Sequence, residues 1–338
     1  MDARGVNPKL VFFFRRQHIG PLLISEQTVS DLLTMEDAIG AIEEVTHDQH
    51  LGNAVNYTRT HSYSGAGRYI ATMQAVAYSL GVFGFKTYTI TPEHQNFYVY
   101  LYSLETGSLL AILEANTLGQ FRTGAATGVS VKYLSRKNSS SLAIIGSGFQ
   151  ARTQLEAACK VRDLRSAKVF SPNRSSRVAF AQEMSRHLDM NVRPVDSPSL
   201  ALDAADIIIT ITNSTSPVFN SCDLEPGVHI AAVGGANPYV REIEVAALKK
   251  ADLLVADDLA QLKCESGEFL KPVHTGEILW EQIQELWEVV GGATPGRINC
   301  NDITIFKSLG MALWDIAIAK FIYDKAILHN AGYRLNVP

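Results

Sequence analysis

A glycine motif between an apolar run and a helical pattern constrains the fold of this chain more than any other feature. The apolar run covers residues 142–145, and Gly146, Gly148 and Ala151 follow it in G-x-G-x-x-A spacing, before a helical segment that begins at Thr153. In this motif the first glycine permits a tight turn, the second lets the backbone approach a pyrophosphate, and the alanine lets the helix pack closely on the strand. The N–H groups at the helix start then bind the phosphates. The sequence therefore predicts a dinucleotide-binding βα turn; the alternative is an ordinary βα turn without a ligand.

After residue 135 the hydrophobic pattern alternates between strand and helix. Strands are expected at residues 141–145, 167–170, 207–212, 229–233 and 253–256, with helices between several of them, for example at 178–187. This βαβ rhythm is typical of a parallel, doubly wound sheet, so we expect an α/β fold with a Rossmann domain.

The chain before this region follows a different pattern. Residues 22–51 are expected to be helical, with Thr34 and Asp37 as an N-cap pair. Strands are expected at 69–76, 81–90, 97–103 and 109–114, a helix at 117–134, and a long helix at 309–330 near the end of the chain. A mainly β unit therefore precedes the α/β unit.

Charge and cysteine usage exclude several classes of protein. The net charge of -4 gives no basic surface, so neither nucleic acid nor a membrane is expected as a partner. The four cysteines are scattered without C-x-x-C spacing, which indicates neither a metal site nor a disulfide framework and favours a reduced, cytoplasmic location. The apolar run at 10–14 is too short to span a membrane, and Arg15 and Arg16 follow it rather than precede it. We expect an extra edge strand or a disordered extension there.

The segment after the second α/β strand bears on which dinucleotide binds. An NAD site places an Asp or Glu here to accept hydrogen bonds from the ribose 2′-OH, whereas this chain has Asn173, Arg174, Ser175 and Arg177. An arginine holds a 2′-phosphate through charge-assisted hydrogen bonds. We therefore expect NADP(H) to be preferred, with NAD(H) also usable; the alternative is that Arg174 is a solvated loop residue.

Five short runs have the order and spacing of one known family. They are Phe85-Lys86, Gln120–Ala126, Ile145–Ala151, Val233–Pro238 with Arg241-Glu242, and Thr304–Ala312. Together they resemble the ornithine cyclodeaminase/mu-crystallin family, from about residue 22 to the end. The resemblance implies a dinucleotide-binding Rossmann domain at 122–305, and a mainly β, substrate-binding and dimerisation domain formed by 1–121 and completed by the last helix within 306–338. It also implies a homodimer that pairs through the β domain; the alternative is a self-contained sheet.

Three cations stand at motif positions of the first domain. By resemblance, Arg59 and Arg122 clamp an α-carboxylate and Lys86 lies against the reacting carbon–nitrogen centre, so Lys86 and Arg122 are the candidate catalytic residues. Guanidinium groups bind a carboxylate bidentately, and an ammonium can donate a proton to a hydride acceptor or polarise it. Lys86 also interrupts the apolar run 82–85, and the nearby positive charges are expected to lower its pKa. Met73 is a candidate for the substrate wall, although core packing explains it equally well.

The motif and the resemblance together assign a larger set of residues to the cofactor. We expect cofactor contacts from Gly146, Ser147, Gly148, Phe149, Gln150, Ala151, Asn173, Arg174, Ser175, Thr210, Thr212, Asn213, Val233, Gly234, Ser308 and Leu309. Among these, the segments 210–213 and 233–234 pass near the nicotinamide, and 308–309 cover the ring from the other side.

Hydride transfer to or from an imine at an α-carbon is the expected reaction class. In the cyclodeaminase branch, and in the archaeal alanine dehydrogenase, the position of Ala236 is an aspartate that handles the amine or the attacking water. Its replacement favours plain reduction of a small imino-acid substrate, such as the cyclic ketimines pyrroline-2-carboxylate and piperideine-2-carboxylate. The alternatives are a cyclodeaminase that converts ornithine to proline and ammonia, an amino-acid or opine-like dehydrogenase, and an NADP-regulated small-ligand-binding protein like mu-crystallin.

Overall fold

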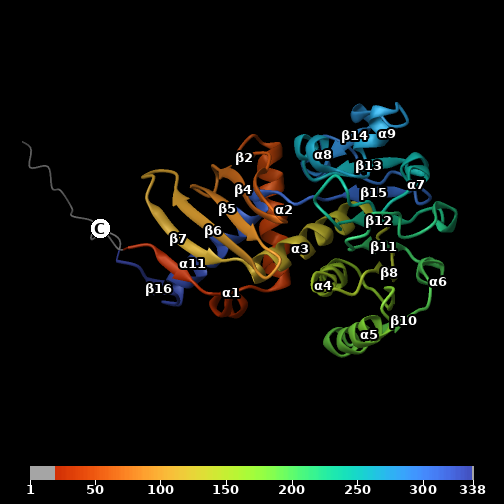
Figure 1. Cartoon of the computed structure of the whole chain (residues 1–338), viewed down its shortest axis with the longest axis horizontal. Helices are drawn as coiled ribbons and strands as arrows, with labels where there is room; N and C mark the ends of the chain where they lie inside the picture. The colour runs from red at the N-terminus through yellow and green to blue at the C-terminus, as the bar shows by residue number, and fades with distance from the viewer. Residues whose placement is uncertain (1–19, 337–338) are drawn as a thin grey trace, which may run out of the picture.

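The computed structural model describes residues 20–336, which form two eight-stranded sheets side by side (Figure 1). The first sheet has the strand order β16-β1-β7-β6-β5-β4-β2, with β3 paired to β4. Its strands are β1 (Leu22–Ile24), β2 (Ala54–Asn56), β3 (Thr60–Gly65), β4 (Arg68–Ala77), β5 (Val82–Ile90), β6 (Gln95–Ser103), β7 (Leu109–Glu114) and β16 (Tyr333–Arg334). The run at 10–14 lies outside the described residues.

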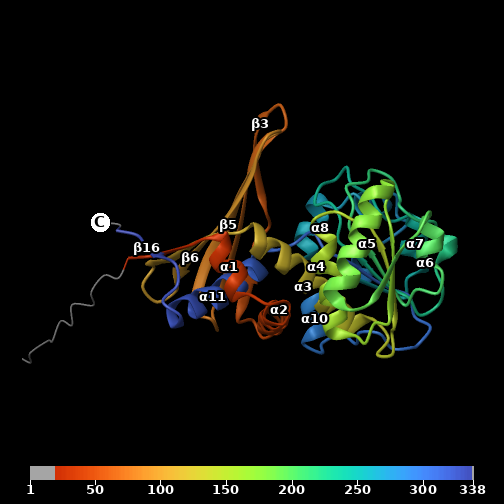
Figure 2. The same cartoon turned by 90° about the horizontal axis from the view of Figure 1, so that it is seen from below.

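Strands β4 to β7 form an antiparallel meander whose side chains alternate between two faces. One face packs on helix α11 (Ala312–Leu328). On the opposite face Phe83 stacks on Tyr102 and Phe85 stacks on Tyr100, with ring centroids 5.5 and 4.7 Å apart. All four aromatic side chains are only half-buried in the single chain. Figure 2 shows the hairpin of β3 and β4 projecting from this half of the molecule.

Residues 22–51 were expected to be helical, but the segment begins with strand β1. Two helices follow, α1 (Glu26–Leu32) and α2 (Met35–His50). The predicted N-cap pair is confirmed as a capping box, because the side chains of Thr34 and Asp37 each accept the other's backbone N–H at 3.2 Å. The three residues of β1 pair in parallel with β7, a partner far along the chain, so no local pattern reveals them.

The second sheet is parallel throughout, in the order β10-β9-β8-β11-β12-β15-β13-β14, and confirms the doubly wound α/β fold. Its strands are β8 (Ser141–Ile145), β9 (Ser166–Phe170), β10 (Asn191–Pro194), β11 (Ile207–Thr210), β12 (His229–Ala232), β13 (Leu253–Ala256), β14 (Ile283–Glu285) and β15 (Thr304–Lys307). The helices of this half are α4 (Ala151–Val161), α5 (Arg174–Leu188), α6 (Pro198–Leu202), α7 (Val245–Lys250), α8 (Leu259–Glu265), α9 (Leu270–His274) and α10 (Leu286–Val290). The central strands β11 and β12 are buried along their whole length, as expected for a sheet covered on both faces.

Helix α3 (Asn116–Leu134) runs from one half of the molecule to the other (Figure 1). Its first N–H groups, those of Asn116 and Thr117, donate to the carboxylate of Glu26 at 2.6 and 2.9 Å. An anion there complements the positive end of the helix dipole. The predicted domain boundaries at 121/122 and 305/306 fall inside α3 and β15, so a division at those residues stays a prediction.

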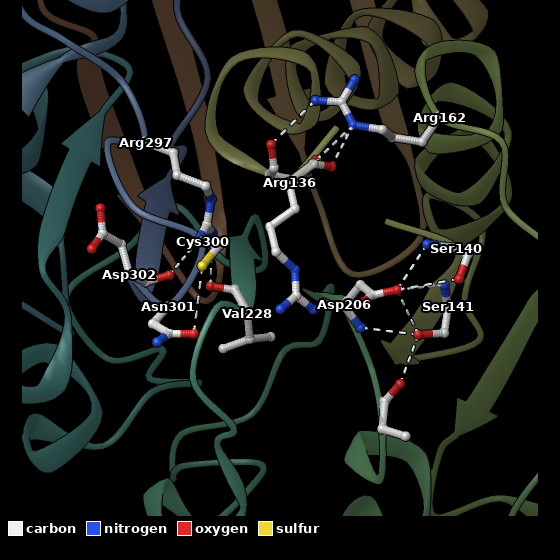
Figure 3. A network of polar contacts seen from close by, with 12 residues as sticks. Arg136, Ser140, Ser141, Arg162, Asp206, Val228, Arg297, Cys300, Asn301 and Asp302 are labelled. Carbon is white, nitrogen blue, oxygen red and sulfur yellow. Dashed lines mark hydrogen bonds and ion pairs between the residues drawn. The ribbon is translucent and has the colours of Figure 1, made fainter. Parts of the chain in front are cut away.

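The carboxyl end of α3 is held by two arginines of the second half, Arg162 and Arg297. Figure 3 labels both of them. Arg162 donates to the carbonyl oxygens of Val131 and Lys132 at 2.9 and 2.7 Å, and Arg297 donates to that of Leu134 at 2.8 Å. Cations at this end satisfy carbonyls that have no partner within the helix. Opposite charges therefore secure α3 at both ends.

Within residues 20–336, no helix is long and apolar enough to cross a membrane, and no group of three or more His, Cys, Asp or Glu side chains is arranged to hold a metal ion.

Candidate active site

A cavity of about 590 Å³ lies between the two halves, where the carboxyl ends of the parallel strands face β4, β5, β6 and α3. Ligands of doubly wound sheets bind at this edge. The predicted site residues that line it are Arg59, Met73, Lys86, Arg122, Gly148, Phe149, Gln150, Thr212, Asn213, Val233, Gly234, Ser308 and Leu309. Among the described residues, those that line the cavity include no Asp or Glu.

An adjoining cavity of about 360 Å³ opens over the glycine turn. It is lined by three more predicted residues, Gly146, Ser147 and Asn173. Arg174 and Ser175 are exposed beside it, at the start of α5, and do not line it. The two cavities adjoin, because Gly148, Ile211 and Thr212 line both of them.

Two predicted cofactor residues are buried in the protein instead. Ala151 is fully buried at the start of α4, which fits its predicted packing role. Thr210 is also fully buried, and its hydroxyl donates to the carboxylate of Glu242 at 2.7 Å. Glu242 also accepts the N–H groups of Thr212 and Gly234 at 2.6 and 2.9 Å, so Thr210 supports the cavity wall without facing the cavity.

The glycine turn fits a pyrophosphate. Gly146 has a φ of 116°, and a Cβ at this position would clash with the carbonyl oxygen of Ile211. Among residues 20–336, no side chain caps the start of α4, where Gln150 is the N-cap residue. The Ala151 N–H donates to the Gly148 carbonyl at 3.1 Å, so the turn itself closes on the helix start, and the dipole of the helix favours an anion there.

The three predicted cations come together in the larger cavity. Arg59 lies between β2 and β3, Lys86 in the middle of β5, and Arg122 in the first half of α3. Their exposed fractions are 8%, 3% and 9%. Buried cations need partners, and the partners of all three are side chains or carbonyls that sequence reasoning missed.

The partner of Lys86 and Arg122 is Asp315, on α11. Its Oδ1 accepts from Lys86 Nζ at 3.0 Å and from Arg122 Nε at 3.2 Å, and the residue is fully buried. The sequence did contain a signal: Asp315 is a single charge in the otherwise apolar run 312–319, as Lys86 is in its own strand. Only the fold shows that these two charges pair with each other.

The pKa of Lys86 is lowered to about 8, and the expected repulsion by nearby cations contributes without being the largest cause. Burial of the ammonium is the largest cause, repulsion by Arg122 and Arg59 adds to it, and the attraction of Asp315 opposes it. The pKa of Asp315 itself is held below its usual range, because the two cations outweigh the effect of burial.

Arg59 joins the two halves across the cavity. Its Nη2 donates to the carbonyl oxygens of Leu309 and Gly310 at 2.7 and 2.9 Å, and its Nη1 lies 3.5 Å from Glu265 of α8. Its backbone N–H donates to Gln261 of the same helix at 2.6 Å. These contacts fix the position and orientation of the Arg59 guanidinium at the cavity wall.

The segment 308–310 is itself held by Asp257, which follows β13. One oxygen of this buried carboxylate accepts from Ser308 Oγ and from the N–H groups of Leu309 and Gly310, at 2.8, 2.7 and 2.6 Å. Gly310 has a φ of 80°, and a Cβ there would clash with the guanidinium of Arg122. The carbonyls that hold Arg59 therefore have a fixed position.

The wall opposite the glycine turn is aromatic. Tyr88 stacks on Phe97 with ring centroids 5.3 Å apart, Tyr69 meets Tyr88 edge-on at 6.2 Å, and Met73 lies on the same wall. Phe97 also lies under the Lys86 ammonium, 5.6 Å from its ring centroid. One cavity thus combines an apolar wall, a cationic floor and an anion-binding turn.

Comparisons with known proteins agree with this geometry. The model of the ornithine cyclodeaminase/mu-crystallin family matches residues 21–330. A Δ1-pyrroline-2-carboxylate reductase of Bacillus cereus is 35% identical over 271 residues, covering 78% of this chain and 83% of that protein. The structure of the Thermococcus litoralis Δ1-pyrroline-2-carboxylate reductase in complex with NADH and L-proline is 33% identical, with a TM-score of 0.89, and covers 93% of this chain and 100% of that chain. An archaeal alanine dehydrogenase dimer with bound NAD is 32% identical, with a TM-score of 0.88, and covers 94% and 99%.

Proposed function

Because the chain belongs to the ornithine cyclodeaminase/mu-crystallin family, we propose that it is an NAD(P)H-dependent reductase of α-imino acids. Cyclic ketimines such as pyrroline-2-carboxylate and piperideine-2-carboxylate are the substrates of this proposal. The observation that carries it is the meeting of Arg59, Lys86 and Arg122 in one cavity with the glycine turn. The relatives named for Δ1-pyrroline-2-carboxylate reduction, one of them in complex with NADH and L-proline, support this substrate class.

The carboxylate of the imino acid binds to Arg59 and Arg122 in this proposal. Both guanidinium groups line the cavity: Arg122 is bonded to Asp315 through Nε, and Arg59 is held by the Leu309 and Gly310 carbonyls through Nη2 and by Glu265 near Nη1. A planar guanidinium offers further N–H groups that match the two oxygens of a carboxylate. The ring of the substrate then lies against the wall of Met73 and Tyr88, where it loses contact with water.

Lys86 supplies the proton of the reaction. When bound, the reduced nicotinamide supplies the hydride, which adds to the imine carbon as the carbon–nitrogen double bond becomes single. The nitrogen then takes the proton of the Lys86 ammonium. With a pKa of about 8, Lys86 is mostly protonated at neutral pH and still a strong enough acid to release its proton.

The same proposal includes a preference for NADP(H) over NAD(H). Within the described residues 20–336, those that line the cavity over the glycine turn include no carboxylate for a ribose 2′-OH. Of the two arginines predicted there, Arg177 already binds partners within the protein. It donates to the Ser171 carbonyl at 2.9 Å and forms an ion pair with Asp196. Arg174 is the exposed one and is the candidate for the 2′-phosphate.

A homodimer through the first sheet completes the proposal. The half-exposed aromatic face of β5 and β6 is the surface that a second copy would cover. The alanine dehydrogenase relative is a dimer, which supports this arrangement.

The test is a direct assay of the purified protein. With NADPH or NADH and a panel of cyclic imines, we expect oxidation of the cofactor with pyrroline- or piperideine-2-carboxylate. With NAD and ornithine we expect no ammonia, because Ala236 lines the cavity where a cyclodeaminase needs an acid or base. Ala236→Asp is the matched variant, in which traces of ammonia are expected. Steady ammonia release by the wild type without net cofactor reduction would overturn the reductase assignment and identify the protein as a cyclodeaminase.

A further inference from the structure

We propose that Asp315 is a positioning residue for this reaction: its carboxylate fixes the Lys86 ammonium and the Arg122 guanidinium relative to each other and keeps Lys86 protonated. The inference rests on the proposed function in one respect, namely that the Lys86 proton is transferred to the imine nitrogen. The contacts that carry it are independent of that function.

The first observation is the geometry of the ion triad. A single oxygen of Asp315 bridges Lys86 Nζ at 3.0 Å and Arg122 Nε at 3.2 Å. The other oxygen, Oδ2, is buried and accepts no hydrogen bond from the described residues. The negative charge of Asp315 is therefore compensated by these two cations, which come from β5 and α3 while Asp315 comes from α11.

The second observation is the balance of charge around Lys86. The charged groups that act on it are Asp315 from α11, Arg122 from α3 and Arg59 from the segment before β3, and the phenol of Tyr88 lines the same cavity. Of these groups in the described part of the chain, Asp315 alone is an anion. Without it, Lys86 would face two positive charges in a buried site, which favours the neutral amine.

Packing alone gives no reason for a carboxylate at this position. Helix α11 is buried by apolar side chains on both sides of Asp315, for example Trp314 and Ile316. A buried charge is costly unless it is paired, and replacing a buried ion pair with well-packed apolar groups is often neutral or stabilising. The role of the carboxylate is therefore to pair with Lys86 and Arg122, which reach the cavity, and not to stabilise helix α11.

The experiment compares Asp315→Asn with the wild type by two readouts. In the cofactor-free protein, the pKa of Lys86 is measured from the ¹³Cε shift of labelled lysine, with the Lys86 signal assigned by its loss in Lys86→Arg. An opposite charge in contact changes a pKa by about 1 to 3 units, so we expect the Lys86 pKa to fall by at least about one unit. In the pH–rate profile of imine reduction, the alkaline limb should move to lower pH by the same amount.

Asp206→Asn is the matched control. Asp206 also pairs with an arginine, Arg136, and accepts the N–H groups of Ser140 and Ser141, but it lies in the network of Figure 3, away from the cavity. This variant should lose stability without any change in the Lys86 titration. An unchanged Lys86 pKa in folded Asp315→Asn, or an equal shift in Asp206→Asn, would overturn the proposal.

A second variant covers the case in which Asp315→Asn does not fold. Arg122→Gln removes one of the like charges that face Lys86, so the Lys86 pKa should rise in it; a fall or no change would overturn the proposal. If the Lys86 pKa falls in Asp315→Asn and the wild-type protein reduces no imine, the control of Lys86 by Asp315 is supported and the reductase assignment is overturned.

Discussion

Arg59 Nη2 donates to the carbonyl oxygen of Leu309 at 2.7 Å, which bonds a side chain of the first half to the segment that leaves the second half. Asp257 holds that segment from the other side. In the proposed function Leu309 faces the nicotinamide and Arg59 faces the substrate carboxylate. The position of the carboxylate relative to the cofactor is therefore set by one hydrogen-bonded connection.

Replacement of Lys86 should separate chemistry from binding. Loss of one proton donor costs about 10² to 10⁴-fold in rate, so Lys86→Ala should lower kcat for cyclic imines by that factor and leave the Kd of NADPH near the wild-type value. Lys86→Arg is the control: it keeps the positive charge, but a guanidinium does not release its proton near neutral pH. Its kcat should therefore be almost as low as that of Lys86→Ala. Fluorescence titration of NADPH checks the Kd. Wild-type kcat in Lys86→Arg would contradict the proton-donor role.

Arg174 should decide between the two cofactors. A hydrogen bond to a charged group contributes ~1.5–3 kcal/mol, which corresponds to about tenfold or more in affinity, so NADPH should bind at least tenfold more tightly than NADH. Arg174→Ala should lose this difference and bind NADH as before. Arg186→Ala, an exposed arginine at the other end of α5, is the control and should change neither affinity. Equal losses for both cofactors in Arg174→Ala would reject the assignment.

The aromatic face of the first sheet should form the dimer interface. Light scattering at micromolar concentration should give twice the mass of one chain. Tyr100→Asp places a charge where Tyr100 stacks on Phe85 and should yield monomers. Ile298→Asp changes a residue that is 73% exposed in the other half of the chain and should leave the dimer intact. A monomeric wild type would contradict the prediction.

His229 should make stability depend on pH. It is fully buried between Thr304 Oγ1 at 2.9 Å and Ser130 Oγ at 3.4 Å, and burial, with repulsion by Arg297, lowers its pKa to about 3. Below pH 6.5 the unfolded chain binds a proton that the folded chain does not, so the free energy of unfolding falls as pH decreases from about 6.5 toward 3. The expected slope is at most about 1.4 kcal/mol per pH unit.

Urea unfolding at pH 7, 6 and 5 measures this slope. His229→Gln should be less stable at pH 7 but should lose less stability between pH 7 and 5 than the wild type does. His94→Gln, which changes an exposed histidine, should lose as much as the wild type. The same loss in His229→Gln as in wild type would contradict the prediction.

The second half could be predicted from sequence because its signals are local. The strand before Gly146, the turn and the start of α4 follow one another within a dozen residues, and β8 has the predicted bounds 141–145. The short strands β2, β10 and β14 are not predicted, because their three or four residues include polar side chains, whereas the equally short strands β11, β12 and β13 are mainly apolar.

The candidate site was predicted by its charged residues and not by their partners. Lys86 and Arg122 belong to motifs, whereas Asp315 is 229 and 193 residues away from them along the chain. Arg59 likewise depends on Gln261, 202 residues away. Pairings over such separations leave no periodicity in the sequence, and only the fold brings the partners together.

Helix α3 fixes the distance between Arg122 and the two ends of the helix. An α-helix rises about 1.5 Å per residue, so Arg122 lies about 9 Å along the axis from the end held by Glu26 and about 18 Å from the end held by Arg162 and Arg297. Gln120, on the same helix, donates to the Phe149 carbonyl of the glycine turn at 2.6 Å. Arg122 and the residue that bonds to the turn are thus two positions apart on one helix. In the proposed function, the backbone of α3 therefore sets the distance between the cofactor and the substrate carboxylate, and side-chain repacking elsewhere in the molecule leaves that distance unchanged.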